Sequence, residues 1–225
     1  MKLRKESLLG YFLITGLLFS CAPVRNVRPV EKGEWRVSGS LGGPMIHFSG
    51  AIIPVPYTSL AAAYGIRKDL SASIGVHTTA LAFGVIQTDI SATYAPLKPS
   101  RWKPGISVVP VVNIAGDIWQ KNIRFWPEIT ANAWWEYGER KHYFYTGLSN
   151  WFELKNKRPN GEEQASHWLI TLNAGNYLCF GNWNFCQEIR FLAPGMDNRK
   201  VVVDYLKPGN SGAIGVYFGV GRKIK

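Results

Sequence analysis

The stretch "LSASIGVHT" (residues 70–78) alternates apolar side chains with small and polar ones, and this pattern decides the fold. Its apolar positions are Leu70, Ala72, Ile74 and Val76. Successive side chains of a β-strand point to opposite faces, so a period of two residues predicts a strand with one apolar and one polar face. The same period appears in "IQTDISATY" (86–94) and in "GAIGVYFGVG" (212–221). Because helical spacing is hard to find anywhere, we expect an all-β protein.

Segments of this kind predict about ten strands, within a range of about 8 to 12. They lie near residues 35–42, 59–67, 70–79, 85–95, 105–113, 123–136, 142–153, 167–180, 184–192 and 212–222. Residues 45–53 and 200–206 are candidates for additional strands. The connections alternate between short turns and mostly longer loops, which is the layout of an antiparallel up-and-down transmembrane β-barrel.

The composition of the two strand faces favours a membrane barrel over a soluble sandwich. The predicted polar faces carry many small residues and charges of both signs, as a narrow barrel interior requires. Many Trp and Tyr residues stand near predicted strand ends, where membrane barrels have aromatic girdles. The expected interior polar network consists of Arg36, His77, Asp89, Arg124, Glu128, Glu188 and Arg190. We expect its three carboxylates to pair with its three arginines and to fill the lumen rather than to line a solute pathway.

On these strands and aromatic residues, roughly residues 34–222, the chain resembles bacterial outer-membrane β-barrel proteins. The resemblance implies contact with outer-membrane lipids, and the basic loop residues suggest contact with lipopolysaccharide phosphates. The closing stretch "GAIGVYFGVGRKIK" (212–225) resembles the signal read by the barrel-assembly machinery, although four residues follow its last glycine. That machinery is therefore an expected partner during biogenesis.

The first residues have the features of an export signal. A basic start precedes an apolar run, Leu8–Phe19, that is too short to cross a bilayer as a helix. We therefore predict a cleaved signal peptide over residues 1–20. The sequence that ends in Cys21 resembles the lipobox of bacterial lipoproteins, which implies that Cys21 receives lipid, palmitate included, and becomes the mature N-terminus.

The predicted organisation follows from this cleavage site. Residues 21–33 are expected to form a lipidated linker and residues 34–225 a single barrel domain, anchored by lipid to the bacterial outer membrane. The formal net charge is +11, but an exported chain seldom meets nucleic acid, so an anionic lipid surface is the expected partner. We predict no cofactor and no metal site, since no CxxC motif or other ligand spacing is present.

Two further cysteines lie in "YLCFGNWNFCQ" (177–187). If Asn182 and Trp183 form the turn of a hairpin, Cys179 lies opposite Cys186. Cysteines directly opposite each other on antiparallel strands can have the separation that a disulfide requires, and an exported protein meets an oxidising compartment. The sequence therefore predicts a disulfide between Cys179 and Cys186.

One polar cluster is a candidate for catalysis. His77 shares a face with Asp89 and Ser91, and a His beside a carboxylate and a hydroxyl is the combination used in nucleophilic hydrolysis. A satisfied polar network in the lumen is the more common role for such a cluster. We therefore expect a non-enzymatic envelope protein that serves in structure, adhesion or narrow-solute passage. A lipid-modifying hydrolase with His77 as its base and a soluble periplasmic lipocalin-like lipoprotein that binds an apolar ligand remain as alternatives.

Overall fold

The computed structural model describes residues 25–119, 122–157, 163–164, 166–197 and 203–224. Its strands are β1 (Trp35–Phe48), β2 (Ala51–Pro54), β3 (Thr58–Arg67), β4 (Leu70–His77), β5 (Val85–Leu97), β6 (Gly105–Asp117), β7 (Ile123–Tyr137), β8 (His142–Phe152), β9 (Trp168–Phe180), β10 (Trp183–Asp197) and β11 (Ser211–Ile224). One short helix, α2 (Thr78–Ala82), connects β4 to β5 in this part of the chain.

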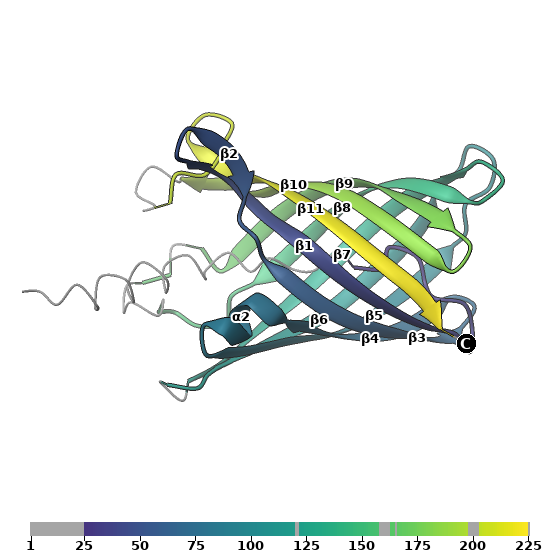
Figure 1. Cartoon of the computed structure of the whole chain (residues 1–225), viewed down its shortest axis with the longest axis horizontal. Helices are drawn as coiled ribbons and strands as arrows, with labels where there is room; N and C mark the ends of the chain where they lie inside the picture. Colours follow the sequence, from purple (N-terminus) through teal and green to yellow (C-terminus); the bar gives the residue numbers. More distant parts are fainter. Residues whose placement is uncertain (1–24, 120–121, 158–162, 165, 198–202, 225) are drawn as a thin grey trace, which may run out of the picture.

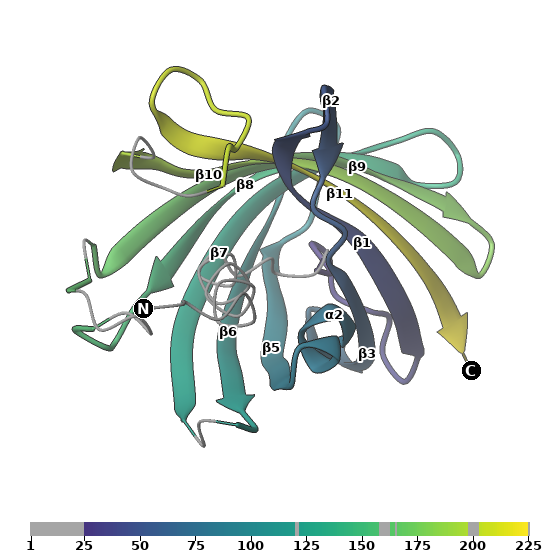
Figure 2. The ribbon, with the colours of Figure 1, turned by 60° about the vertical axis from the view of Figure 1, so that its left-hand side comes forward.

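The strands close into a barrel. Each wall strand pairs antiparallel with its neighbours in the chain, and β11 pairs with β1 to close the ring (Figures 1 and 2). β2 pairs only with the last residues of β1, so ten of the strands in the described residues form the wall. The start of β1 and the end of β11 lie side by side at the end of the barrel with short turns, where Trp35 pairs with Ile224.

The structure confirms the ten predicted strands and sets their ends. The candidate strand at 45–53 is the β1–β2 hairpin. In the other candidate, 200–206, the first residues lie outside the described part, and Tyr205 forms only an isolated bridge to Ile46. The sequence analysis did not expect the short helix, Thr78–Ala82, which forms a single turn between β4 and β5. No helix among the described residues has the length and apolar character to cross a membrane.

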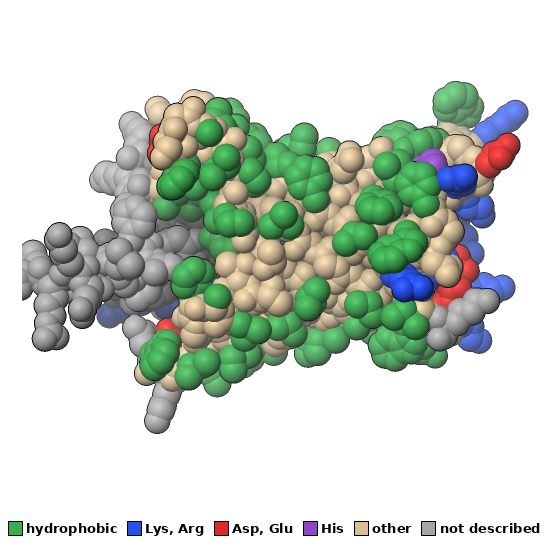
Figure 3. All heavy atoms as spheres, viewed as in Figure 1, with side chains coloured by type: hydrophobic (Ala, Val, Ile, Leu, Met, Phe, Trp, Pro, Cys, Tyr) green, Lys and Arg blue, Asp and Glu red, His purple; other side chains and the backbone are tan. Residues whose placement is uncertain are grey.

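The apolar faces of the strands point outward. Ile74 is 51% exposed and Ile90 is 52% exposed, whereas Ser71 and His77 on the alternate positions are buried. Hydrophobic side chains are spread over the wall in Figure 3, and Lys and Arg gather at the end where the C-terminus lies. A polar interior with an apolar exterior is the arrangement of a transmembrane β-barrel, which confirms the predicted fold class. It is the opposite of what a soluble lipocalin-like protein needs.

Exposed aromatic side chains lie at both ends of the wall. Those near the short turns are Trp35, Tyr64, Tyr94, Trp102, Tyr137, Phe180 and Trp183. Those near the long loops are Phe48, Phe83, Trp119, Phe125 and Trp168. These two sets match the girdles of membrane barrels. Trp134 and Tyr143 also lie near strand ends, but they are almost fully buried and do not belong to the girdles.

An arginine in the middle of the apolar exterior should strongly oppose membrane insertion. Ile90→Arg, at the centre of β5, is expected to cost about 2–4 kcal/mol of folding free energy in a bilayer. Leu97→Arg, at the short-turn end of the same strand, should cost less than about 1 kcal/mol, because the penalty falls toward the interface. Urea titration of barrels folded into phospholipid vesicles measures both. Equal costs at the two depths would contradict the proposed lipid-facing surface.

Candidate functional site

The N-terminal segment, residues 25–33, enters the barrel: residues 25–30 are buried or half-buried, and residues 31–33 are exposed. The sequence analysis expected a lipidated linker over residues 21–33 and did not assign it a place in the lumen. Val27 is 4% exposed and Val30 is fully buried. Val27 belongs to a cluster formed with Ala95, Trp134, Tyr143, Tyr145, Tyr177 and Cys186, which come from strands on different sides of the lumen. The segment therefore fills the barrel interior.

Small residues of the wall make room for the segment backbone. The Ser107 hydroxyl donates a hydrogen bond of 2.6 Å to the Val27 carbonyl oxygen, and the Thr93 hydroxyl donates one of 3.1 Å to the carbonyl oxygen of Asn26. At Gly65 of β3 a Cβ atom would lie 1.9 Å from the carbonyl oxygen of Glu31. Glycine is therefore required where the wall and the segment come closest.

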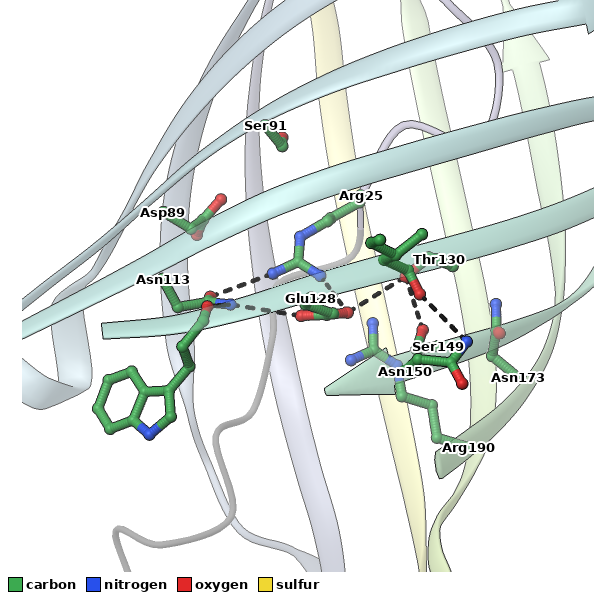
Figure 4. Close-up of polar contacts among 12 residues, drawn as sticks. Arg25, Asp89, Ser91, Asn113, Glu128, Thr130, Ser149, Asn150, Asn173 and Arg190 are labelled. Atoms are coloured by element: carbon green, nitrogen blue, oxygen red, sulfur yellow. Dashed lines mark hydrogen bonds and ion pairs between the residues drawn. The ribbon is translucent and has the colours of Figure 1, made fainter. Parts of the chain in front are cut away.

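Arg25 binds a carboxylate in the half of the lumen nearer the long loops. Its Nη1 lies 2.7 Å from Oε1 of Glu128 on β7, and its Nη2 donates to Oδ1 of Asn113 on β6 at 3.3 Å (Figure 4). The Thr130 hydroxyl donates to the same Glu128 oxygen at 3.2 Å. Glu128 is buried, so this charge-assisted pair forms away from bulk water, where such pairs are strong.

Arg28 binds a second carboxylate near the short turns. Its Nη1 lies 2.8 Å from Oε1 of Glu136, close to the end of β7, and its guanidinium carbon lies 5.3 Å from the ring centre of Tyr143. Burial disfavours the charge of Arg28, but the electrostatic effects of Tyr143 and Glu136 outweigh burial and raise the pKa of the guanidinium. Arg28 therefore stays charged inside the barrel.

The end of the segment is fixed at the short-turn rim. The Gly33 N–H donates to the Gly65 carbonyl oxygen at 2.8 Å, and the Lys223 ammonium lies 3.1 Å from a carboxylate oxygen of Glu31. The hydrogen bond and the charge of Lys223 lower the pKa of the Glu31 carboxyl below 4.5. Because the pKa is lowered in the folded state, this contact is present above pH 4.5 and is lost as the pH falls through the lowered value.

Little free space remains beside Arg25 and Val27. The cavity beside Arg25 and Val27 has a volume of about 30 Å³ and is lined by wall residues that include Glu128, Asn173 and Arg190. Such a volume holds about two water molecules and no larger solute. At this level of the lumen the segment therefore leaves room for water and for no larger solute.

The structure buries six of the seven residues expected in the interior network, and their pairing differs from the expected one. Glu188 pairs with Arg190 as expected. Glu128 instead pairs with Arg25 of the segment, and Arg36 donates a hydrogen bond of 2.9 Å to Asn26. The members buried in the lumen are Arg36, His77, Asp89, Glu128, Glu188 and Arg190.

Arg124 was wrongly placed in the network. It is half-buried near the long-loop end of β7 and donates a hydrogen bond of 3.3 Å to the carbonyl oxygen of Lys157. Arg124 therefore belongs to the rim rather than to the lumen.

The candidate catalytic residues are only partly brought together. Nε2 of His77 lies 3.1 Å from Oδ2 of Asp89, and both side chains are buried. The Ser91 hydroxyl is hydrogen-bonded to Ser73 at 2.6 Å. The hydrogen-bond partner of Ser91 is therefore another hydroxyl rather than a base, and the expected order of nucleophile, base and carboxylate is not formed. No group of three or more His, Cys, Asp or Glu residues in the described chain could hold a metal ion.

The predicted disulfide is not formed, and Cys179 and Cys186 are both free thiols. In the β9–β10 hairpin Cys179 pairs with Asn184, and Cys186 pairs with Tyr177. The turn residues are Gly181 and Asn182, one position earlier than expected, and this changes every pair of the hairpin by two residues. Cys186 instead packs in the aromatic cluster around Val27.

Sequence reasoning missed the two arginines that hold the segment in the lumen. A signal was present in "VRNVRPV" (residues 24–30), where valine and arginine each recur every third residue and a proline follows Arg28. Three residues per turn is the period of a polyproline II helix, in which one face can be apolar. That pattern indicates an extended segment with a buried face rather than a solvated linker.

No family model and no curated protein matches this chain. Among solved structures it is similar to the translocator domain of the autotransporter NalP from Neisseria meningitidis, with a TM-score of 0.44, 7% identity, and 96% of this chain and 95% of that chain covered. It is also similar to the NanC porin, with a TM-score of 0.44, 8% identity, and coverage of 84% and 100%. For the outer membrane protein OprG from Pseudomonas aeruginosa the TM-score is 0.27, the identity 8%, and the coverage 88% and 99%.

Proposed function

We propose that this protein is a gated barrel of the bacterial outer membrane that passes small hydrophilic solutes when residues 25–33 leave the lumen. One observation carries the proposal: a polar lumen bounded by small wall residues is closed by a segment that is not part of the wall. A barrel that served only as a membrane scaffold could fill its interior with the side chains of its own strands. Here the volume is filled by a separate chain segment, which can move.

The wall does not need the segment for its closure. β1 and β11 pair over ten residue positions, from Trp35 with Ile224 to Pro44 with Gly215. The hydrogen-bond ladder of the barrel therefore stays complete when the segment leaves. The segment is held by side-chain contacts of Arg25 and Arg28, by the burial of Val27 and Val30, and by a few hydrogen bonds to its backbone. This arrangement favours a gate that opens without unfolding of the wall.

The variant Arg25→Gln/Arg28→Gln tests the gate. Loss of the buried pair between Arg25 and Glu128, worth about 2 kcal/mol or more, should shift the equilibrium between closed and open barrels by about 30-fold or more. The exposed pair between Arg28 and Glu136 should add less to this shift. In planar lipid bilayers we expect closed wild-type barrels and frequent long openings of the variant. Swelling of vesicles in a small sugar provides a second readout.

Lys32→Gln is the matched control, because Lys32 is an exposed cation of the same segment. It should conduct no more than the wild type. If Arg25→Gln/Arg28→Gln is folded and stays as impermeable as the wild type, the gate is wrong and a purely structural or adhesive role follows.

We also propose lipid attachment at Cys21, which lies outside the described residues. Arg25 is four positions after Cys21, a reach of about 14 Å at full extension. A lipid on Cys21 would therefore tether the start of the segment that occupies the lumen.

Intact-mass measurement of the protein from membranes tests the lipid, with Cys21→Ser as the control. We expect a mass increment of fatty acyl groups and diacylglycerol that the Cys21→Ser variant lacks. If neither the wild type nor Cys21→Ser carries a lipid, the proposed anchor is wrong. The proposed gate does not depend on this result.

A further inference from the structure

The lumen wall contains two binding sites for guanidinium groups, and the protein's own segment occupies both. From this we infer that the barrel is a receptor for cationic peptides with arginines in an Arg-x-x-Arg spacing, for which residues 25–33 act as an internal competitor. The inference rests on the proposed function, since it requires that the segment can leave the lumen.

The first site takes a planar cation. Glu128 and Asn113 come from neighbouring strands and accept from Nη1 and Nη2 of the same guanidinium, at 2.7 and 3.3 Å. In Figure 4 the Arg25 side chain points between these two acceptors. A guanidinium carries its donors in a fixed fork, so one group can satisfy both acceptors at once. A lysine ammonium lacks this planar geometry.

The second site combines a carboxylate with an aromatic face. Glu136 accepts from Arg28 at 2.8 Å, and the ring of Tyr143 stacks near the same guanidinium at 5.3 Å. Arginine binds such faces through cation–π contact while keeping its hydrogen bonds in the guanidinium plane. Both walls of the site belong to the barrel rather than to the segment.

The spacing of the two sites sets the length of the ligand. Glu128 and Glu136 are eight positions apart on β7, about 26 Å along the strand. One arginine cannot contact both carboxylates. Arg25 and Arg28 do so with two residues between them and with side chains that reach toward opposite ends of the lumen.

The wall keeps unused hydrogen-bonding groups beside these sites. Oδ1 of Asn173, which lines the cavity next to Arg25, and the hydroxyl of Tyr143 are buried without a hydrogen-bond partner. Both residues are more than nine-tenths buried. Buried polar atoms usually have partners, so these two point to a ligand with more donors than the segment provides.

Departure of the segment would leave the wall with an excess of negative charge at both sites. Glu128 and Glu136 would each lose the guanidinium that neutralises them. Arg190, the basic residue that lines the cavity with Glu128, is paired with Glu188. The empty lumen should therefore attract cations and repel anions.

Binding of a synthetic peptide tests the inference. The probe is fluorescein-labelled RNVRPVEKG, the sequence of residues 25–33. The control peptide has citrulline, which is isosteric with arginine but uncharged, in place of both arginines. Fluorescence anisotropy is measured with full-length Arg25→Gln/Arg28→Gln protein in detergent micelles. We expect the arginine peptide to bind at least about 30-fold more tightly than the citrulline peptide, since two charge pairs are lost. Wild-type protein should bind the probe more weakly than the variant, because its own segment competes.

Variants of the wall locate the binding. Glu128→Gln introduced into Arg25→Gln/Arg28→Gln should weaken binding of the arginine peptide by about tenfold or more, and Glu139→Gln, at an exposed turn, should not. Faster migration of unboiled protein on gels verifies that each variant is folded. Equal affinity for the arginine and citrulline peptides, or no effect of Glu128→Gln, would overturn the inference. If Arg25→Gln/Arg28→Gln binds the arginine peptide more tightly than the citrulline peptide but does not conduct, the receptor role is supported and solute passage through the opened barrel is rejected.

Discussion

Glu128→Gln is expected to release the N-terminal segment from the lumen. The substitution removes the carboxylate at 2.7 Å from Arg25 and leaves a guanidinium in a buried position without its counter-charge. Removal of one partner of a buried pair costs about 3–5 kcal/mol, and the segment can avoid most of that cost by leaving. Trypsin cleavage after Arg25, followed by mass spectrometry of protein in vesicles, measures the release. Cleavage should be at least about 100-fold faster in Glu128→Gln than in the wild type.

Glu139→Gln removes a carboxylate from an exposed turn and is the control for this experiment. It should be cleaved at the wild-type rate. If trypsin cleaves the Arg25–Asn26 bond of Glu128→Gln as slowly as that of the wild type, the pair between Arg25 and Glu128 does not hold the segment in the lumen.

Gly65→Ala is expected to expel the segment by steric conflict. The added Cβ would lie 1.9 Å from the Glu31 carbonyl oxygen, far inside contact distance. Hydrogen bonds of Gly65 to Gly33 and Glu34 hold the two backbones at this separation, so a small shift cannot relieve the clash. The wall ladder is extensive and the segment joins it only at Gly33, so the segment should move rather than the wall. In planar bilayers Gly65→Ala should conduct at least as much as Arg25→Gln/Arg28→Gln.

Gly116→Ala is the matched substitution, since a Cβ at Gly116 on β6 meets no atom within 4 Å. It should stay closed like the wild type. A folded Gly65→Ala barrel with wild-type conductance would contradict the packing of the segment against β3.

The wall of this barrel could be predicted because its signal is local. Alternation along each strand assigns every side chain to one face, as in "LSASIGVHT" at residues 70–78, and it needs no knowledge of neighbouring strands. The register between neighbouring strands is less local, because it depends on the turn that joins them. A turn at Gly181–Asn182 rather than Asn182–Trp183 keeps each residue on its face but changes its partner, which is why Cys179 faces Asn184 and not Cys186.

The segment in the lumen could not be predicted by the same reasoning. Arg25 and Glu128 are 103 positions apart, and nothing in the neighbourhood of either residue identifies the other. His77 and Asp89 are 12 positions apart on adjacent strands, and their contact followed from strand pairing alone. The pairing of the charges in the lumen therefore depends on which segment of the chain enters the barrel. Alternation along the strands does not identify that segment.

A thiol at position 27 tests most directly whether the segment lies inside the lumen. Val27 packs in the same cluster as the native Cys186, with Cys179 at its edge. In Val27→Cys protein with Cys21→Ser, mild oxidation in vesicles should give an internal disulfide to one of these native thiols. Lys32→Cys in the same background should give none, because Lys32 is exposed. Rapid labelling of Val27→Cys by a water-soluble maleimide, without any internal disulfide, would contradict the closed barrel.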